Sequence, residues 1–176
     1  MKTLSTLAVL SLTAAAQALT VDLQFGTASL GTPLGSAGAN KADNSSVVGV
    51  GIGTQLSDTS HLGLVLSTRD IVTADPIDAK ARTAIIEYTY ELNPHGGIHP
   101  FVGAGIGYAW LKNTLGATAL ASDVFAGLRF TVTESVDLTF TGRLHQLYNV
   151  DFSQVIGESN RQVNSFEAIA GLRFKF

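Results

Sequence analysis

Residues 163–176 alternate between two kinds of side chain, and this alternation limits the possible folds more than any other feature of the chain. Successive side chains point to opposite faces of a strand, whereas a helix repeats about every 3.6 residues, so the stretch predicts a β-strand with two unlike faces. One face is apolar and rich in aromatic rings: Phe166, Ala168, Ala170, Leu172, Phe174 and Phe176. The other face is mostly small, polar or charged: Ser165, Glu167, Ile169, Gly171, Arg173 and Lys175.

Seven earlier segments alternate in the same way, at residues 20–27, 46–56, 61–69, 82–92, 100–112, 120–132 and 136–148. The connections between segments are alternately long, at 28–45, 70–81, 113–119 and 149–162, and short, at 57–60, 93–97 and 133–135. Outer-membrane barrels combine short periplasmic turns with longer outer loops. The pattern therefore predicts an all-β protein that forms an eight-stranded antiparallel up-and-down transmembrane β-barrel.

The bulk of the apolar face indicates which side of the barrel meets lipid. The interior of an eight-stranded barrel is only wide enough for side chains to fill it. Phenylalanine, tyrosine, tryptophan and leucine on nearly every strand exceed that space, while the glycines of the other face leave room for longer polar side chains. The chain is 45% hydrophobic and only 14% charged, against about 25% charged in soluble domains. We therefore expect the apolar face to point outward into a membrane.

The polar face then lines the lumen, and its charges must pair because an unpaired charge in a narrow interior is costly. This predicts a plugged lumen without a continuous water channel, which argues against a general porin. A narrow channel for small solutes stays open as an alternative. We call the inward-facing charges the lumen charge network: Asp22, Arg69, Glu87, Glu91, Asp123, Arg129, Asp137, Arg143, Glu167, Arg173 and Lys175.

Aromatic residues at the strand ends predict two girdles at the membrane surfaces. Trp110 and Tyr148 fall near the outer ends, and Tyr90, Phe130, Phe174 and Phe176 fall near the inner ends. Arg82 and Lys112 lie on the outward face at the outer ends of neighbouring strands. They are candidate contacts for the phosphates of lipopolysaccharide, with two snorkelling surface charges as the alternative.

The first 18 residues are typical of an export signal. Lys2 precedes an apolar run from residue 4 to residue 16, and Ala16-Gln17-Ala18 fits a small-x-small cleavage site. The run is too short to span a membrane as a helix. We expect a cleaved signal peptide at residues 1–18 and one mature domain at residues 19–176.

The segment Pro-Phe-Val-Gly-Ala-Gly-Ile-Gly-Tyr at residues 100–108 closely resembles a strand of the outer-membrane β-barrel family that includes the opacity proteins and the membrane domain of outer membrane protein A. The sequence Ala-Gly-Leu-Arg-Phe, at residues 126–130 and again at 170–174, and the terminal Phe176 extend the resemblance over the mature chain. It implies a monomer in the bacterial outer membrane, with a role in envelope integrity, adhesion or another surface interaction through the outer loops. It also implies that the barrel-assembly machinery recognises Phe176.

No motif predicts catalysis, a cofactor or a metal. Glycines recur at every second residue in 103–107, whereas the dinucleotide fingerprint needs Gly-x-Gly-x-x-Gly before a helix. A barrel lipase that deacylates lipid A carries an outward His with a Ser two residues on, but Leu147 follows His145 at that distance and the alternation turns His145 inward. A rim hydrolase acting on lipids is therefore the least favoured function.

Other ligand classes also lack support in the sequence. His61, His95 and His99 lack the spacing of metal ligands. The chain has no cysteine, which excludes disulfides and thiolate metal sites. Its net charge of −3 gives no indication of a nucleic-acid partner.

Overall fold

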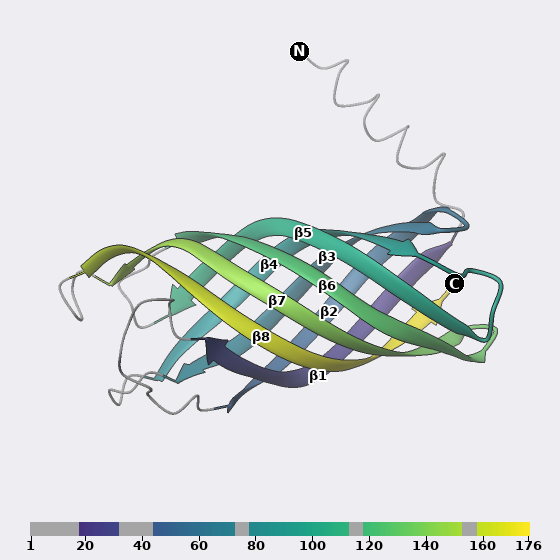
Figure 1. The fold of residues 1–176 in the computed structure, drawn as a ribbon, viewed down its shortest axis with the longest axis horizontal. Helices are drawn as coiled ribbons and strands as arrows, with labels where there is room; N and C mark the ends of the chain where they lie inside the picture. Colours follow the sequence, from purple (N-terminus) through teal and green to yellow (C-terminus); the bar gives the residue numbers. More distant parts are fainter. Residues whose placement is uncertain (1–17, 32–43, 73–77, 113–117, 153–157) are drawn as a thin grey trace, which may run out of the picture.

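The computed structural model describes residues 18–31, 44–72, 78–112, 118–152 and 158–176, and within these ranges the regular structure is all β. The strands lie side by side, steeply inclined to a common long axis (Figure 1). Their bounds are β1 (Leu19–Gly31), β2 (Asn44–Ser57), β3 (Ser60–Val72), β4 (Asp78–Glu91), β5 (Ile98–Lys112), β6 (Thr118–Thr133), β7 (Val136–Phe152) and β8 (Glu158–Lys175).

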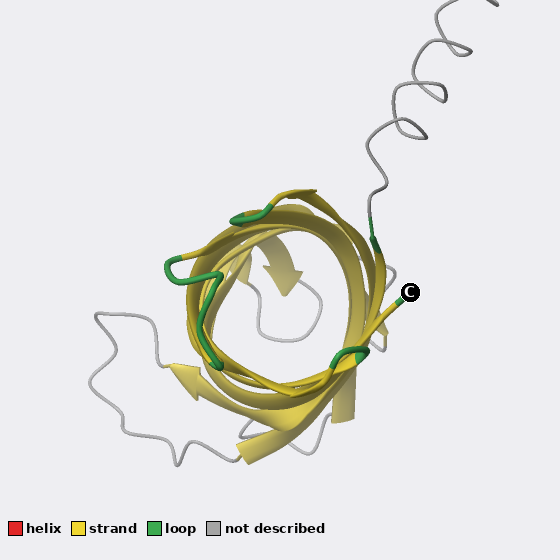
Figure 2. Ribbon diagram, turned by 90° about the vertical axis from the view of Figure 1, so that its right-hand side faces the viewer, coloured by secondary structure: helices red, strands yellow, loops and turns green. Residues whose placement is uncertain are grey.

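The sheet closes on itself. Each strand runs antiparallel to the one before it, and β1 also pairs with β8, so the view along the axis is a ring (Figure 2). At the closure Val21 lies opposite Phe174, and the backbone amide of Phe176 donates to the carbonyl oxygen of Leu19 over 3.0 Å. A closed sheet has no edge with unpaired backbone groups, as a sheet in lipid requires. The predicted eight-stranded antiparallel barrel is confirmed.

The parts of the chain that the structure describes contain no helix with the length and apolar character needed to cross a membrane.

The two ends of the barrel differ. The three short connections, which follow Ser57, Glu91 and Thr133, lie at the same end as residue 18 and the C-terminus (Figure 1). We call this the turn end and the opposite one the loop end. The turns are fixed by short-range hydrogen bonds: Ser57 Oγ lies 2.6 Å from Ser60 Oγ, and His99 Nδ1 lies 3.0 Å from the carbonyl oxygen of Asn93.

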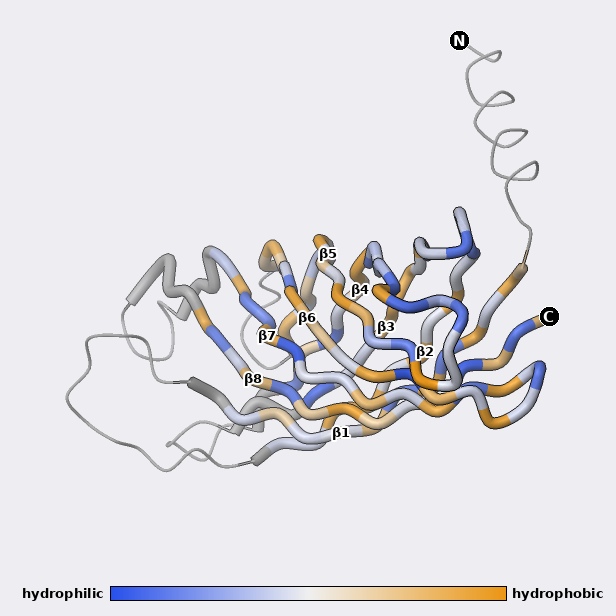
Figure 3. The backbone as a smooth tube through the Cα atoms, turned by 45° about the vertical axis from the view of Figure 1, so that its right-hand side comes forward, coloured by the Kyte–Doolittle hydropathy of each residue, from blue (hydrophilic) through white to orange (hydrophobic). Residues whose placement is uncertain are grey.

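The alternation of the sequence becomes an inside and an outside. Along β8, Phe166 is 53% exposed on the outer surface, whereas its neighbour Glu167 is fully buried in the lumen. Bulky apolar side chains cover the outside of every strand, and hydropathy alternates along the tube in Figure 3. This outward-facing apolar surface is suited to lipid and not to water.

At the loop end the strands extend beyond the predicted limits. β7 continues to Phe152 and β8 begins at Glu158, so most of the connection predicted at 149–162 is strand, with Val150 paired to Arg161. Residues 70–72 likewise belong to β3, and residues 78–81 belong to β4. The predicted boundaries were wrong because alternation marks only the part of a strand that has lipid on one side. At this end of β4 and β6 the inward positions carry the apolar residues Ala81 and Ala119, so the pattern of apolar outside and polar inside is lost while backbone pairing continues.

Two predictions concern residues outside the described ranges. Of the predicted signal peptide at 1–18, only Ala18 is described, and of the predicted connection at 28–45, residues 32–43 are not described. The signal peptide stays a prediction. Residues 28–31 and 44–45 of that connection are strand.

Candidate functional site: the lumen and the outer wall

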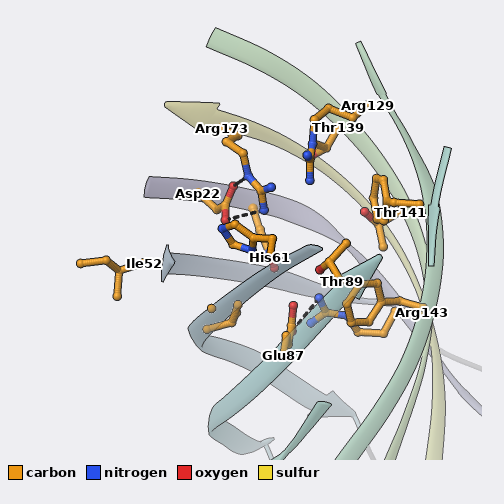
Figure 4. A pocket seen from close by; sticks show the side chains of 15 residues that line it. Asp22, Ile52, His61, Glu87, Thr89, Arg129, Thr139, Thr141, Arg143 and Arg173 are labelled. Atoms are coloured by element: carbon orange, nitrogen blue, oxygen red, sulfur yellow. Dashed lines mark hydrogen bonds and ion pairs between the residues drawn. The ribbon is translucent and has the colours of Figure 1, made fainter. Parts of the chain in front are cut away.

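Ion pairs join distant strands across the centre of the lumen. Arg143 of β7 lies 2.9 Å from Glu87 Oε1 of β4 and 3.6 Å from Asp123 Oδ2 of β6, and the first pair is drawn in Figure 4. Arg69 of β3 pairs with Glu167 of β8. None of these five residues is more than 7% exposed. Each charge is thus offset by an opposite one, which a buried ion requires.

Three further pairs lie nearer the turn end. Arg173 donates from Nε and from a terminal nitrogen to the two carboxylate oxygens of Asp22, over 2.6 and 3.0 Å. This is the two-pronged geometry that gives guanidinium–carboxylate pairs their strength. Lys175 Nζ lies 2.9 Å from Asp137 Oδ1. The rest of the lumen charge network, Arg129 and Glu91, forms a third pair.

Two arginines also stack on phenyl rings that point into the lumen. The guanidinium carbon of Arg143 lies 5.2 Å from the centre of the Phe125 ring, and that of Arg129 lies 5.4 Å from the centre of the Phe101 ring. The two rings contact each other edge to face, with centres 6.3 Å apart. Stacking of this kind adds cation–π attraction to the ion pairs and fills space between them.

Lumen glycines make room for these large side chains. A Cβ atom on Gly105 would lie 3.0 Å from Cγ of Glu87, as expected if glycines accommodate the charged residues. A Cβ atom on Gly103 would instead meet the Phe125 ring and lie 2.6 Å from the carbonyl oxygen of Tyr88. Glycine therefore makes room for aromatic rings as well as for charged side chains, whereas the sequence had predicted only room for polar side chains.

Sequence reasoning also missed an apolar layer inside the barrel at its loop end. Ile85, Leu111 and Leu147 point inward there and are 1%, 5% and 2% exposed. Small side chains pack between them, and none of the layer carries a polar side chain. The sequence does hold a signal for it, since Ile85 lies between the polar residues Thr83 and Glu87 on the inward face of β4. The apolar layer consists of Ala81, Ile85, Ala109, Leu111, Ala119, Ala121 and Leu147.

The remaining free space in the described lumen is uneven. A central cavity of about 40 Å³ lies among Glu87, Arg143 and Arg173, which leaves room for a few water molecules at most. A vestibule of about 660 Å³ opens at the turn end, lined by residues that include His61, Glu91 and Lys175. The vestibule narrows to the central ion pairs, and the apolar layer lies beyond them.

Two histidines, His61 and His145, are buried inside the barrel. His145 is inside the barrel and 1% exposed, opposite Asp123 of β6 and Ser165 of β8. His61 Nε2 lies 2.8 Å from Thr20 Oγ1. Among the residues that the structure describes, no three His, Asp or Glu side chains are grouped to hold a metal ion.

The outer wall carries the residues predicted to meet the membrane surfaces. Trp110 and Tyr148 lie toward the loop end, and Tyr90, Phe130, Phe174 and Phe176 lie toward the turn end, all with outward-facing positions. Arg82 is exposed opposite Trp110, and Lys112 lies opposite Lys80 in the register.

A polar cluster on this wall escaped the sequence reasoning. Ser122 of β6 and Gln146 and Tyr148 of β7 occupy outward positions near the loop end and are half-buried. Ser122 Oγ lies 3.3 Å from the Tyr148 hydroxyl, which in turn donates to Gln146 Oε1. Polar residues at outward positions, where the alternation elsewhere places apolar ones, are the signal that could have revealed it.

The comparisons with known proteins identify the fold as the small eight-stranded β-barrel of bacterial outer membranes. They rest on solved structures, since no protein-family model and no curated protein sequence matches the chain.

The structure of Neisserial surface protein A matches with a TM-score of 0.66 and 23% identity, over 90% of this chain and 99% of that one. The outer membrane enzyme PagL matches with a TM-score of 0.59 and 16% identity, over 86% and 97% of the two chains. Ail, the attachment invasion locus protein of Yersinia pestis, matches with a TM-score of 0.54 and 10% identity, over 92% and 99%. At such identities the likeness establishes the fold alone.

Proposed function

We propose that this protein is an integral outer-membrane barrel whose lumen conducts no solutes and whose role lies at the cell surface, in adhesion or in the integrity of the envelope. The observation that carries the proposal is the occupied lumen, with paired charges at its centre and the apolar layer at its loop end. A general porin keeps a water-filled channel through the barrel. The proposal includes no catalytic role.

The loop end is the place for a surface contact. Binding functions tend to lie in loops that a rigid scaffold positions, and here the strands continue beyond the alternating, lipid-facing segments. Ail is the attachment invasion locus protein of Yersinia pestis, and its structure has been solved in complex with sucrose octasulfate, a heparin analogue. A sulfated polysaccharide is therefore the first ligand to test on this chain.

Binding of whole bacteria to immobilised heparin tests the surface role. Cells that express the full chain should bind, and replacement of residues 32–43 or 153–157 by a Gly-Ser sequence of equal length should reduce binding. Replacement of the turn residues 134–135 at the opposite end is the matched control and should leave binding unchanged. Equal binding by cells with and without the protein, on heparin and on host cells, contradicts adhesion and leaves the envelope role.

A narrow channel is the second candidate, because the vestibule of about 660 Å³ reaches inward from the turn end. Recordings of the purified protein in planar bilayers separate the two functions. We expect no steady openings, and steady openings of uniform conductance would establish the channel instead. Incubation with radiolabelled lipopolysaccharide checks the absence of a catalytic role, which released acyl chains would disprove.

A further inference from the structure

The charges of the lumen charge network do not balance in number. The network contains five cations and six carboxylates. Arg143 lies between two carboxylates, 2.9 Å from Glu87 Oε1 and 3.6 Å from Asp123 Oδ2. We call Arg143, Glu87 and Asp123 the central triad, and it carries one negative charge in excess when all three side chains are ionised. The other four cations form one-to-one pairs, with the carboxylates of Asp22, Glu91, Asp137 and Glu167.

The charged groups beside the central triad are balanced among themselves. Arg69 of β3 pairs with Glu167 of β8, and these two side chains face Asp123. Arg173 of β8 pairs with Asp22 of β1, and these two face Glu87. Each pair is neutral as a unit, so neither offsets the excess charge of the triad.

His145 of β7 is the remaining titratable group at this level of the described lumen. It lies opposite Asp123 in the register and is 1% exposed. Neither of its ring nitrogens has a hydrogen-bond partner among the described residues. An imidazolium ion carries two N–H donors, and burial of charged donors without acceptors costs more than burial of a neutral ring. The surroundings therefore favour a neutral His145, which leaves the excess charge in place.

Within the central triad, Asp123 has the least compensation for a negative charge. It is 3% exposed, and neither of its carboxylate oxygens has a hydrogen-bond partner among the described residues. Its Oδ1 lies against the backbone of β5, since a Cβ atom on Gly105 would lie 2.5 Å from it. Glu87 and Arg143 line the central cavity of about 40 Å³, where a water molecule has room, and Asp123 does not line it (Figure 4). A buried carboxylate without hydrogen bonds or water is the costliest of the three to keep ionised.

We propose that the central triad is a binding site for one proton, which Asp123 holds as a neutral carboxylic acid at neutral pH. The proton comes from the solvent when the barrel folds and bonds to one carboxylate oxygen of Asp123, and no other bond changes. Arg143 then forms its ion pair with Glu87 alone, and the lumen charge network carries no net charge. The inference concerns the sealed lumen and goes beyond the proposed surface role.

Infrared spectroscopy of the refolded full chain tests the site, in a detergent without ester groups that would overlap the signal. Carboxyl groups in water have pKa values of about 4 and are ionised at pH 7, so the carbonyl-stretching band of a protonated acid at that pH reports a buried one. We expect this band in the wild type, with a shift in heavy water. Asp123→Asn should abolish it. Glu87→Gln should also abolish it, because Asp123 then becomes the partner of Arg143.

Asp137→Asn is the matched control, because it removes a carboxylate from a one-to-one pair, with Lys175 at the vestibule, and should keep the band. Absence of the band in the wild type, or its persistence in Asp123→Asn, overturns the proposal. A band that appears only when sodium is replaced by a large organic cation would show that sodium occupies the site and would also overturn it. Heat-modifiable gel migration confirms that each variant is folded.

Urea unfolding in lipid vesicles at pH 7 gives a second readout. Asp123→Asn replaces a neutral acid by a neutral amide and should change the folding equilibrium constant by less than about tenfold. Glu167→Gln leaves the buried Arg69 without its partner and should lower that constant by about 100-fold or more. The double variant Glu87→Gln with Asp123→Asn leaves Arg143 unpaired and should cost as much as Glu167→Gln. An equally large loss for Asp123→Asn alone would show that Asp123 is ionised, which contradicts the proton site and leaves the heparin-binding test of the surface role unaffected.

Discussion

At the scale of single residues, the buried ion pairs give a direct prediction for stability. Arg143→Met keeps much of the side-chain volume but leaves Glu87 and Asp123 without their common partner in the lumen. Loss of one partner of a buried pair costs about 3–5 kcal/mol. Urea unfolding in lipid vesicles should show that Arg143→Met lowers the free energy of unfolding by this amount. Arg82→Met makes the same chemical change at an exposed outward position and should lower the free energy of unfolding by well under about 1 kcal/mol. Equal effects of the two changes would contradict the role of Arg143 as the buried partner of Glu87 and Asp123.

The sequence indicates the direction of each side chain but not its partner. A strict period of two fixes which residues enter the lumen, so Arg143 and Glu167 could be placed inside without a structure. Glu167 lies opposite Arg143 in the register, yet it pairs with Arg69, and Arg143 pairs with Glu87 and Asp123. The pairing depends on the stagger of strands that are far apart in the chain, such as the 98 residues between Arg69 and Glu167. No local pattern encodes that stagger.

At the scale of elements, two variants at the C-terminal end of the chain, in and just after β8, can distinguish refolding in detergent from assembly in cells. Phe176 is 76% exposed and Phe166, on the same outer face, is 53% exposed. Neither ring fills the lumen, so replacement of either by Ala should leave refolding of the purified protein in detergent unchanged. If the assembly machinery reads the terminal aromatic, Phe176→Ala should lower the amount of folded barrel in cells, and Phe166→Ala should not. Gel migration of heated and unheated outer-membrane fractions measures this, and equal amounts for the two variants would count against the recognition of Phe176.

The number and order of the strands could be predicted, whereas their outer ends could not. Each strand has lipid on one side and a packed lumen on the other, so apolar and polar residues must alternate along the sequence. At the loop end of β7 and β8 backbone pairing continues beyond the alternating residues, since Val150 and Arg161 still pair. The apolar layer escaped prediction for a related reason. On a single strand, an inward-facing Ile or Leu looks like an isolated exception to a polar face, because the sequence does not show which residues of other strands lie beside it.

At the scale of the whole molecule, the lumen contains two barriers in series. The central ion pairs exclude all but a few water molecules, and the apolar layer lies next to them, since Ala121 and Asp123 are successive inward positions on β6. A constriction without polar side chains resists the passage of ions even when it is not completely filled. When two barriers lie in series, the one that remains still blocks the flow of ions. Removal of one barrier should therefore leave the barrel closed.

Planar bilayer recordings of three variants test this arrangement. Glu87→Ala with Arg143→Ala removes the principal central pair, and Leu111→Ala with Leu147→Ala opens the apolar layer. We expect neither double variant to conduct and the quadruple variant to give steady openings, because only the last joins the vestibule to the loop end. Each variant must first show heat-modifiable migration, since buried Leu→Ala changes cost about 2–5 kcal/mol each. Steady openings of the Glu87, Arg143 variant alone would show that the apolar layer is permeable and that the ion pairs are the only seal.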